Sequence, residues 1–331
     1  MSADRPRLLV LTQNEPPPDI ERLRTLAEVT IGDESRLVAQ LAEADIVYVW
    51  DFFWDRHTDA LDLAWQGARP RWVHIANVGI EKLASPGLIE SGAVVTNAVG
   101  VYERPIAEHV LTAYLALAKQ VPLALRHQHS KTWHRLATQQ IEGRRAVVVG
   151  AGPIGREIAR LIGAVGMPVD LVGRSARTDE EFGAIHASTE LRDLLPDAGL
   201  VVLVAPLTDE TRGMLGPAEL ALLGEETILV NVGRGELVDE DALIDALRER
   251  RFGGAAIDVF AVEPLPASSP IWSLPNTLVT AHMAGTTTGW RDRLTGVFTA
   301  NLEAWVAGDP LRNIVDPAEL ARVAAARPGP R

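Results

Sequence analysis

The chain has 331 residues, of which 47% are hydrophobic and 23% charged, and this length is enough for two domains with substantial cores. It contains no cysteine, which excludes disulfides and thiolate metal sites and favours a cytoplasmic location. The net charge of −12 argues against binding to nucleic acid. Charged residues interrupt the apolar stretches before they reach membrane length, so we expect no membrane partner.

Short apolar runs alternate with segments of helical spacing along most of the chain. The first series predicts strands at 7–13, 28–32, 45–50, 71–76 and 93–98, with helices at 19–27 and 34–44. A long helical run at 107–128, with Pro122 inside it, precedes a second series. That series predicts strands at 145–150, 168–173, 200–205, 227–232, 253–260 and 277–281, helices at 155–165 and 239–250, and a helix near the tail from 318. This alternation indicates an α/β fold with parallel sheets covered by helices on both faces.

A glycine-rich turn follows the strand predicted at 145–150 and opens the next helix. It fits G-x-G-x-x-G and comprises Gly150, Ala151, Gly152, Pro153, Ile154 and Gly155. The first glycine allows a tight turn, the second lets the backbone approach a pyrophosphate, and the third lets helix and strand pack closely. The helix N-terminus adds free N–H groups for the phosphates. The pattern predicts a dinucleotide site, and an ordinary strand-to-helix turn is the alternative.

The next strand, at 168–173, lacks the carboxylate that usually holds a ribose at this point. Asp170 comes too early in the strand, and the strand ends at Gly173. Arg174, Ser175 and Arg177 then supply two positive charges and a hydroxyl that can bind a 2′-phosphate. We therefore expect NADPH to be preferred, with NAD also possible. In an arginine-rich chain, these residues could instead belong to a solvent-exposed loop.

Three polar residues follow three predicted strands at one edge of the second sheet, where ligands of open α/β sheets bind. They are Arg234, Glu263 and His282. Arg234 can hold the carboxylate of a 2-oxo acid, and protonated His282 can deliver a proton to its carbonyl oxygen. Glu263 can orient the imidazole and stabilise its charged form. Taken singly, each has an ordinary alternative as a surface charge, a turn residue or a loop hydrogen bond, and no cluster with metal-ligand spacing is present.

Several segments together resemble the D-isomer-specific 2-hydroxyacid dehydrogenases, and most closely their NADPH-preferring glyoxylate/hydroxypyruvate reductases. The matching segments, from about residue 71 onward, are RPIAEHVLTAYLAL, VVVGAGPIGREIA, APLTDETRGMLG, LVNVGRGELVDEDALIDAL, AAIDVFAVEPLP, VTAHMAGTT and RNIVD. The resemblance implies two doubly wound parallel-sheet domains. A flavodoxin-like substrate domain would comprise 1–98 and 288–331, and a Rossmann cofactor domain would comprise 99–287.

The resemblance also implies roles for individual residues. Arg234, Glu263 and His282 would be the catalytic set, and the substrate carboxylate would bind the backbone N–H groups of Val78 and Gly79. The remaining cofactor contacts would come from Asp258 at the nicotinamide carboxamide, from Pro206 and Thr211 beside the adenosine, and from Gly285. Homodimers are usual in the family, with the helix after Pro105 and the loop around Trp133 at the interface. Glu81 and Ala281 depart from the aspartate and proline that relatives often carry.

The implied reaction is the reduction of a small 2-oxo acid to the D-2-hydroxy acid by NADPH. Two alternatives stay open: an NAD-dependent 3-phosphoglycerate-type dehydrogenase, and a dinucleotide-sensing, corepressor-like binding protein. The aromatic cluster from Trp50 to Trp54 either walls the substrate pocket or packs in a core or interface. Tyr102, Glu103 and Arg104 have no role assigned from the sequence.

Overall fold

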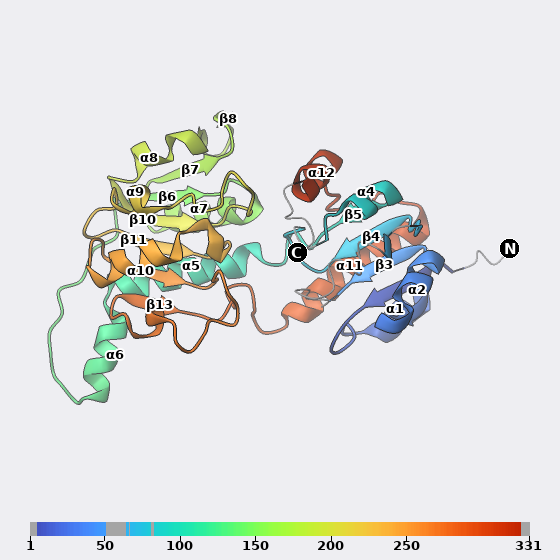
Figure 1. The fold of residues 1–331 in the computed structure, drawn as a ribbon, viewed down its shortest axis with the longest axis horizontal. Helices are drawn as coiled ribbons and strands as arrows, with labels where there is room; N and C mark the ends of the chain where they lie inside the picture. Colours follow the sequence, from blue (N-terminus) through green and yellow to red (C-terminus); the bar gives the residue numbers. More distant parts are fainter. Residues whose placement is uncertain (1–4, 51–63, 66, 81–82, 326–331) are drawn as a thin grey trace. The chain divides into compact units, whose positions relative to one another are not determined.

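The computed structural model describes residues 5–50, 64–65, 67–80 and 83–325 (Figure 1). The chain forms two compact units, which are described separately. Unit 1 comprises Met1–Val101 and Thr288–Arg331, and unit 2 comprises Tyr102–Thr287. The polypeptide therefore passes from one unit to the other twice.

Unit 1 is built around a five-stranded parallel sheet with the strand order β2-β1-β3-β4-β5. This is the 2-1-3-4-5 order of flavodoxin-like folds. The strands are β1 (Arg7–Leu11), β2 (Glu28–Ile31), β3 (Ile46–Val49), β4 (Trp72–Ile75) and β5 (Val94–Thr96). The helices are α1 (Ile20–Leu26), α2 (Leu37–Glu43), α4 (Pro86–Ser91), α11 (Trp290–Ala307) and α12 (Pro317–Ala325).

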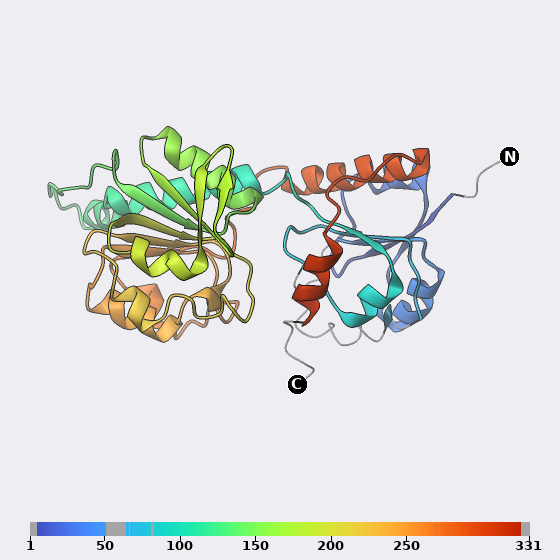
Figure 2. The same cartoon turned by 90° about the horizontal axis from the view of Figure 1, so that it is seen from above.

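Helices cover both faces of this sheet, with α1 and α11 on one face and α2, α4 and α12 on the other (Figure 2). Strands β3 and β4 are buried along their whole length, as expected of central parallel strands. Under α11 lies an aromatic stack in which the ring of Phe298 is 3.9 Å from that of Tyr48 and 5.2 Å from that of Trp72. The second segment of unit 1 is thus part of its core.

Unit 2 contains an eight-stranded sheet in the order β13-β12-β11-β10-β6-β7-β9-β8. All neighbours are parallel except β8 and β9, which form an antiparallel hairpin. The strands are β6 (Arg145–Val149), β7 (Val169–Gly173), β8 (Arg177–Asp179), β9 (Gly183–Ala187), β10 (Ala198–Leu203), β11 (Ile228–Asn231), β12 (Gly254–Ile257) and β13 (Thr277–Val279). The helices are α5 (Glu103–Ala118), α6 (Val121–His129), α7 (Pro153–Ala164), α8 (Leu191–Leu194), α9 (Pro217–Leu220) and α10 (Glu240–Arg248).

The core of unit 2 has two layers, with α5 and α7 packed on one face of the sheet and α8, α9 and α10 on the other (Figure 2). From β9 to β12 the order is that of a Rossmann sheet, 3-2-1-4-5-6, and β13 extends it. The predicted α/β class with two doubly wound parallel sheets is confirmed. Among the described residues, no helix is both long and apolar enough to cross a membrane.

The prediction of one helical run at 107–128 was wrong in detail. The first helix, α5, begins earlier, at Glu103, and ends at Ala118. Gln120 then adopts a left-handed conformation (φ 52°), and α6 starts with Pro122 in its first turn. A proline lacks the N–H that a helix interior needs, so it fits at a helix start and favours the break.

Candidate active site

The loops that follow β11, β12 and β13 lie side by side, because these strands are neighbours in the sheet. Arg234 follows β11, Glu263 follows β12 and His282 follows β13, all at the carboxyl edge. The first two loops touch at Gly235, where an added Cβ would lie only 1.9 Å from the carbonyl carbon of Phe260. Only glycine fits this approach, so the loop of Arg234 is pressed against the loop of Glu263.

His282 and Glu263 form a hydrogen-bonded pair. The distance from His282 Nδ1 to Glu263 Oε2 is 2.8 Å, and Glu263 Oε1 accepts a hydrogen bond from the backbone N–H of Phe260 at 2.9 Å. An ionised carboxylate only accepts, so Nδ1 carries the proton and Nε2 remains to exchange a proton with a substrate. The imidazole is 55% exposed and the carboxylate 35% exposed, so a small molecule can reach the pair.

Asp258 organises the loop that carries His282, a role that sequence reasoning missed. Its buried carboxylate accepts hydrogen bonds from Thr280 Oγ1 at 2.5 Å and from the backbone N–H groups of Met283 and Ala284, both at 2.9 Å. The backbone N–H of His282 also donates to the Asp258 carbonyl at 2.7 Å. These bonds hold His282 in a left-handed conformation (φ 49°) that costs a non-glycine residue energy. The resemblance implies that Asp258 binds the nicotinamide carboxamide. Such a contact would use a carboxylate that already accepts three hydrogen bonds from the His282 loop.

Arg234 is held through its backbone by Asn231 at the end of β11. The Asn231 amide donates to the Arg234 carbonyl at 2.9 Å and accepts from the Gly233 N–H at 3.1 Å. The guanidinium donates to the Gly233 carbonyl at 2.7 Å and is half-buried. This turn sets the place of the arginine at the carboxyl edge, and the role of Asn231 could not be seen in the sequence.

Two more side chains contact the loop that carries His282, namely His109 on α5 and Tyr102 at the N-cap of α5. His109 Nε2 lies 3.4 Å from Thr280 Oγ1 and 4.0 Å from Asp258 Oδ1. The Tyr102 ring lies over Gly285, where an added Cβ would come within 2.6 Å of it. Burial raises the pKa of Tyr102 above its usual 10.0, so its hydroxyl is neutral at physiological pH. Gly285, which the resemblance implies as a cofactor contact, thus lies directly against the Tyr102 ring.

The glycine turn has the geometry of a phosphate cradle. Gly150 has φ 123°, and a Cβ on Gly155 would lie 1.7 Å from the Gly150 carbonyl oxygen. A Cβ on Gly152, by contrast, would meet nothing within 4 Å. Gly152 thus opens toward solvent at the N-terminus of α7, with Pro153 and Ile154 in the first turn, where unpaired N–H groups bind anions. These residues fit the pyrophosphate of a dinucleotide.

The end of β7 carries no free carboxylate. Asp170 forms an ion pair with Arg145, at 2.6 Å. Arg174, Ser175 and Arg177 are exposed, and neither arginine has a carboxylate partner within the described part of the chain. The Arg177 guanidinium lies over Gly173, 2.9 Å from where a Cβ would stand. Two unpaired positive charges therefore lie at the point where a ribose would be held.

The remaining predicted residues occupy two loops. Beside β10, Thr211 Oγ1 donates to the Pro206 carbonyl at 2.7 Å, which closes a compact turn. In unit 1, the backbone N–H groups of Val78 and Gly79 have no acceptor among the described residues, and the Val78 carbonyl accepts from the Asn97 amide at 3.0 Å. Two unpaired N–H groups in a row suit a carboxylate.

Part of the predicted set is outside the described residues, namely Glu81, Phe52, Phe53 and Trp54. Trp50, the first residue of the aromatic cluster, is buried in unit 1. Its ring contacts Tyr48 edge-on, and its N–H donates to the Glu15 carbonyl at 3.1 Å. For Trp50, packing in a core is therefore what the structure shows.

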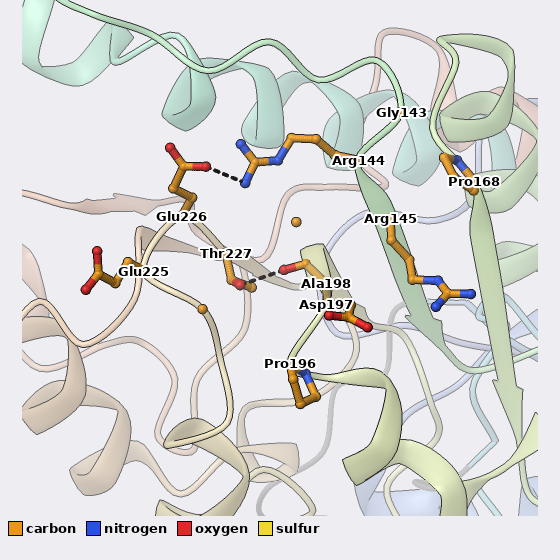
Figure 3. A pocket seen from close by; sticks show the side chains of 12 residues that line it. Gly143, Arg144, Arg145, Pro168, Pro196, Asp197, Ala198, Glu225, Glu226 and Thr227 are labelled. Atoms are coloured by element: carbon orange, nitrogen blue, oxygen red, sulfur yellow. Dashed lines mark hydrogen bonds and ion pairs between the residues drawn. The ribbon is translucent and has the colours of Figure 1, made fainter.

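A cavity of about 610 Å³ opens at the opposite, amino edge of the unit 2 sheet (Figure 3). Its charged side chains are largely neutralised, because Arg144 pairs with Glu226 at 3.0 Å and Arg145 pairs with Asp170. It lies at the other ends of the strands from His282, so it is not the candidate active site. Among the described residues, no group of three or more His, Cys, Asp or Glu is arranged to hold a metal ion.

Comparison with known proteins identifies the family. Residues 111–284 match the D-isomer specific 2-hydroxyacid dehydrogenase, NAD binding domain. The chain is 33% identical over 331 residues to a glyoxylate reductase of Aeropyrum pernix, covering 94% of this chain and 96% of the relative. A D-isomer specific 2-hydroxyacid dehydrogenase from Xanthobacter autotrophicus, solved with NADPH and MES, is 27% identical with a TM-score of 0.77, covering 96% of this chain and 99% of that one.

A fold match at lower identity comes from the NADPH-dependent glyoxylate/hydroxypyruvate reductase of Sinorhizobium meliloti, solved with NADP and sulfate. It has 24% identity and a TM-score of 0.78, and covers 96% of this chain and all of that one. The family pattern spans more than half of the chain, and the relative from A. pernix spans nearly all of it. The chain therefore belongs to the D-isomer-specific 2-hydroxyacid dehydrogenases, a family of oxidoreductases.

Proposed function

We propose that the protein is an NADPH-dependent reductase of small 2-oxo acids of the glyoxylate and hydroxypyruvate type, which forms the D-2-hydroxy acid. The observation that carries the proposal is the His282–Glu263 pair at the carboxyl edge of a sheet whose glycine turn fits a dinucleotide. Relatives named glyoxylate reductase support the substrate class. In this proposal, unit 2 binds the cofactor and unit 1 contributes to substrate binding.

In the proposed reduction of the carbonyl group, His282, Glu263 and Arg234 have different roles. The nicotinamide, when bound, supplies a hydride to the carbonyl carbon. His282 donates the proton from Nε2 to the carbonyl oxygen, and Glu263 stabilises the imidazolium beforehand and keeps Nδ1 protonated. Arg234 pairs with the substrate carboxylate. In unit 1, the backbone N–H groups of Val78 and Gly79, which have no acceptor among the described residues, can donate hydrogen bonds to a carboxylate. The proton lost by His282 is replaced from solvent, which balances the reaction.

A substrate panel tests this proposal and separates it from the phosphoglycerate-type alternative. Glyoxylate, hydroxypyruvate, pyruvate, phenylpyruvate and 3-phosphohydroxypyruvate are each assayed with NADPH and with NADH. We expect the highest kcat/KM for glyoxylate or hydroxypyruvate with NADPH. Preference for the phosphorylated acid with NADH would favour the alternative, and no turnover with any of them would favour a binding protein.

The cofactor preference is expected to depend on Arg174 and Arg177. Each charge-assisted hydrogen bond to a phosphate contributes about 1.5–3 kcal/mol, so Arg177→Ala should raise KM for NADPH about tenfold or more. KM for NADH should change little, because its ribose carries no 2′-phosphate. Steady-state kinetics of the wild type, Arg174→Ala and Arg177→Ala with both cofactors measure this. Equal losses with NADPH and NADH would contradict a phosphate-binding role.

We also propose that the protein is a homodimer and acts in the cytoplasm, where reduced nicotinamide cofactor is available. The support for a dimer is the segment 121–134, here called the arm. Helix α6 buries no residue, Leu125 is 57% exposed and Trp133 is 97% exposed. Large apolar side chains this exposed on one segment are typical of an interface.

The arm provides a direct test of the dimer. Trp133→Glu is expected to weaken the dimer at least about thirtyfold, since a buried interface tryptophan typically contributes 2 kcal/mol or more. Light scattering coupled to size exclusion should then show mass moving from twice 35.8 kDa toward one chain. Trp272→Glu is the matched control, because Trp272 is also exposed (53%) but lies outside the arm. A wild type that is monomeric, or a Trp133→Glu variant that remains dimeric, would contradict the proposal.

A further inference from the structure

The hairpin formed by β8 and β9 carries Arg177 at one end and Asp179 at the other end of its edge strand. Arg177 pairs with Ile185 in the hairpin, and its guanidinium extends back over Gly173 at the end of β7. Strand β8 is only three residues long and has a neighbour on one side only. Strand β8 is therefore held in the sheet by its pairing with β9 alone.

A side-chain contact to β8 comes from α7, the helix that begins at the glycine turn. Arg156 donates to both carboxylate oxygens of Asp179, at 3.3 Å to Oδ1 and closer to Oδ2. The two side chains are only 27% and 12% exposed, and the Arg156 guanidinium lies 5.3 Å from the ring centre of Phe182. A planar fork of this kind fixes both distance and orientation.

Asp179 also shapes the turn of the hairpin. Its Oδ1 accepts from the backbone N–H groups of Glu181 at 3.1 Å and Phe182 at 3.2 Å. The hydrogen bonds from Arg156 are the main reason that the pKa of Asp179 is lowered, so the side chain is charged at neutral pH. One carboxylate thus ties the end of β8 to the turn and to α7.

We propose that the Arg156–Asp179 pair is a positioning device for cofactor selection, which holds Arg177 where the 2′-phosphate of NADPH binds. Asp179 and Arg177 are two positions apart on one strand, about 6–7 Å along the chain, so a shift at one end moves the other. The pair joins the helix that receives the pyrophosphate to the hairpin that receives the 2′-phosphate. This inference depends on the proposed preference for NADPH. It adds Arg156 and Asp179 as positioning residues, which act through Arg177 and not by binding a phosphate themselves.

The variant Asp179→Asn tests the pair without removing the turn. The amide oxygen still accepts from the two backbone N–H groups, but the charge and one acceptor for Arg156 are lost. We expect KM for NADPH to rise about fivefold, in line with a partly exposed ion pair, while KM for NADH and kcat stay unchanged. Arg192→Gln is the matched control, because it breaks a pair with Glu219 of 2.6 Å elsewhere in unit 2. It should change neither KM.

A double-mutant cycle shows whether Asp179 acts through Arg177. In the Arg177→Ala background, Asp179→Asn is expected to have no further effect on KM for NADPH. Arg156→Lys, which keeps the charge but not the fork, should fall between the wild type and Arg156→Gln. An equal rise of KM for both cofactors, or an effect that persists without Arg177, would overturn the inference. If the wild type prefers NADH, the proposed cofactor preference is wrong as well. If the wild type prefers NADPH but Asp179→Asn leaves KM for NADPH unchanged, only the role of the Arg156–Asp179 pair is wrong.

Discussion

Replacing His282 with asparagine is expected to lower kcat for 2-oxo acid reduction by about 10³-fold, within the range that a general acid contributes. Asparagine suits this position for two reasons. It tolerates the left-handed backbone of His282 (φ 49°) better than most residues, and its amide N–H₂ can replace Nδ1–H as donor to Glu263. The variant therefore removes Nε2, the proton donor, while the loop can keep its shape.

The measurement is steady-state turnover of glyoxylate or hydroxypyruvate with NADPH, together with cofactor binding by fluorescence titration. Cofactor affinity should be nearly unchanged, because the glycine turn and the Arg174 region do not touch His282. His129→Asn, an exposed histidine on α6, serves as the matched control and should keep full activity. If His282→Asn retained activity within a factor of a few, the assignment of the general acid would be wrong.

Glu263→Gln distinguishes the charge of the partner from its hydrogen bond. Glutamine can still accept from Nδ1–H but offers no negative charge to the imidazolium. In the same assay we expect kcat to fall about tenfold to hundredfold, less than in His282→Asn. A fall as large as that of His282→Asn would assign Glu263 a more direct part in proton transfer.

The central strands of both sheets could be predicted from the sequence because their residues are apolar and buried on both faces. The hairpin of β8 and β9 could not, since of its residues only Ile185 is buried and no apolar run marks it. Helix α11 was also not predicted, although Leu294, Phe298 and Leu302 recur at helical spacing and are buried. Their signal is weak because polar residues and Gly296 interrupt the pattern.

The members of the candidate site could be named because parallel strands end at a common edge, so residues that follow neighbouring strands converge. The hydrogen bonds and ion pairs that position these residues could not be predicted in this way. The bonds from Asp258 to the His282 loop depend on a left-handed backbone at a histidine, which no local preference indicates. The Arg156–Asp179 pair joins residues 23 positions apart across a hairpin that was not predicted. The contacts that hold the site residues depend on loop conformation, and they could therefore be identified only from the structure.

The buried histidine of unit 1 gives the second large expected effect, a loss of stability in acid. His74 on β4 is fully buried among the rings of Tyr48, Trp72 and Phe298. Its Nδ1 lies 2.7 Å from Thr96 Oγ1, while Nε2 has no hydrogen-bond partner among the residues that the structure describes. Burial lowers its pKa from 6.5 to about 3, because a charged ring could not be solvated there.

The direction of the effect follows from proton binding. Between pH 6.5 and 3 the unfolded chain protonates His74 and the folded chain does not. The unfolded state therefore binds more protons, and the free energy of unfolding falls by about 1.4 kcal/mol for each pH unit below 6.5. The contribution is complete above pH 6.5, and about 4 to 5 kcal/mol is lost by pH 3.

His74→Phe isolates this contribution from the other groups that titrate in acid. Phenylalanine fits an aromatic stack and does not titrate, although Thr96 loses a partner at every pH. Urea unfolding at pH 7, 5.5 and 4.5, followed by tryptophan fluorescence, reports mainly on unit 1, where most of the tryptophans lie. The stability of the variant relative to the wild type should rise by about 2 to 3 kcal/mol from pH 7 to pH 4.5. Parallel pH dependences for His74→Phe and the wild type would mean that the His74 ring is protonated in the folded protein.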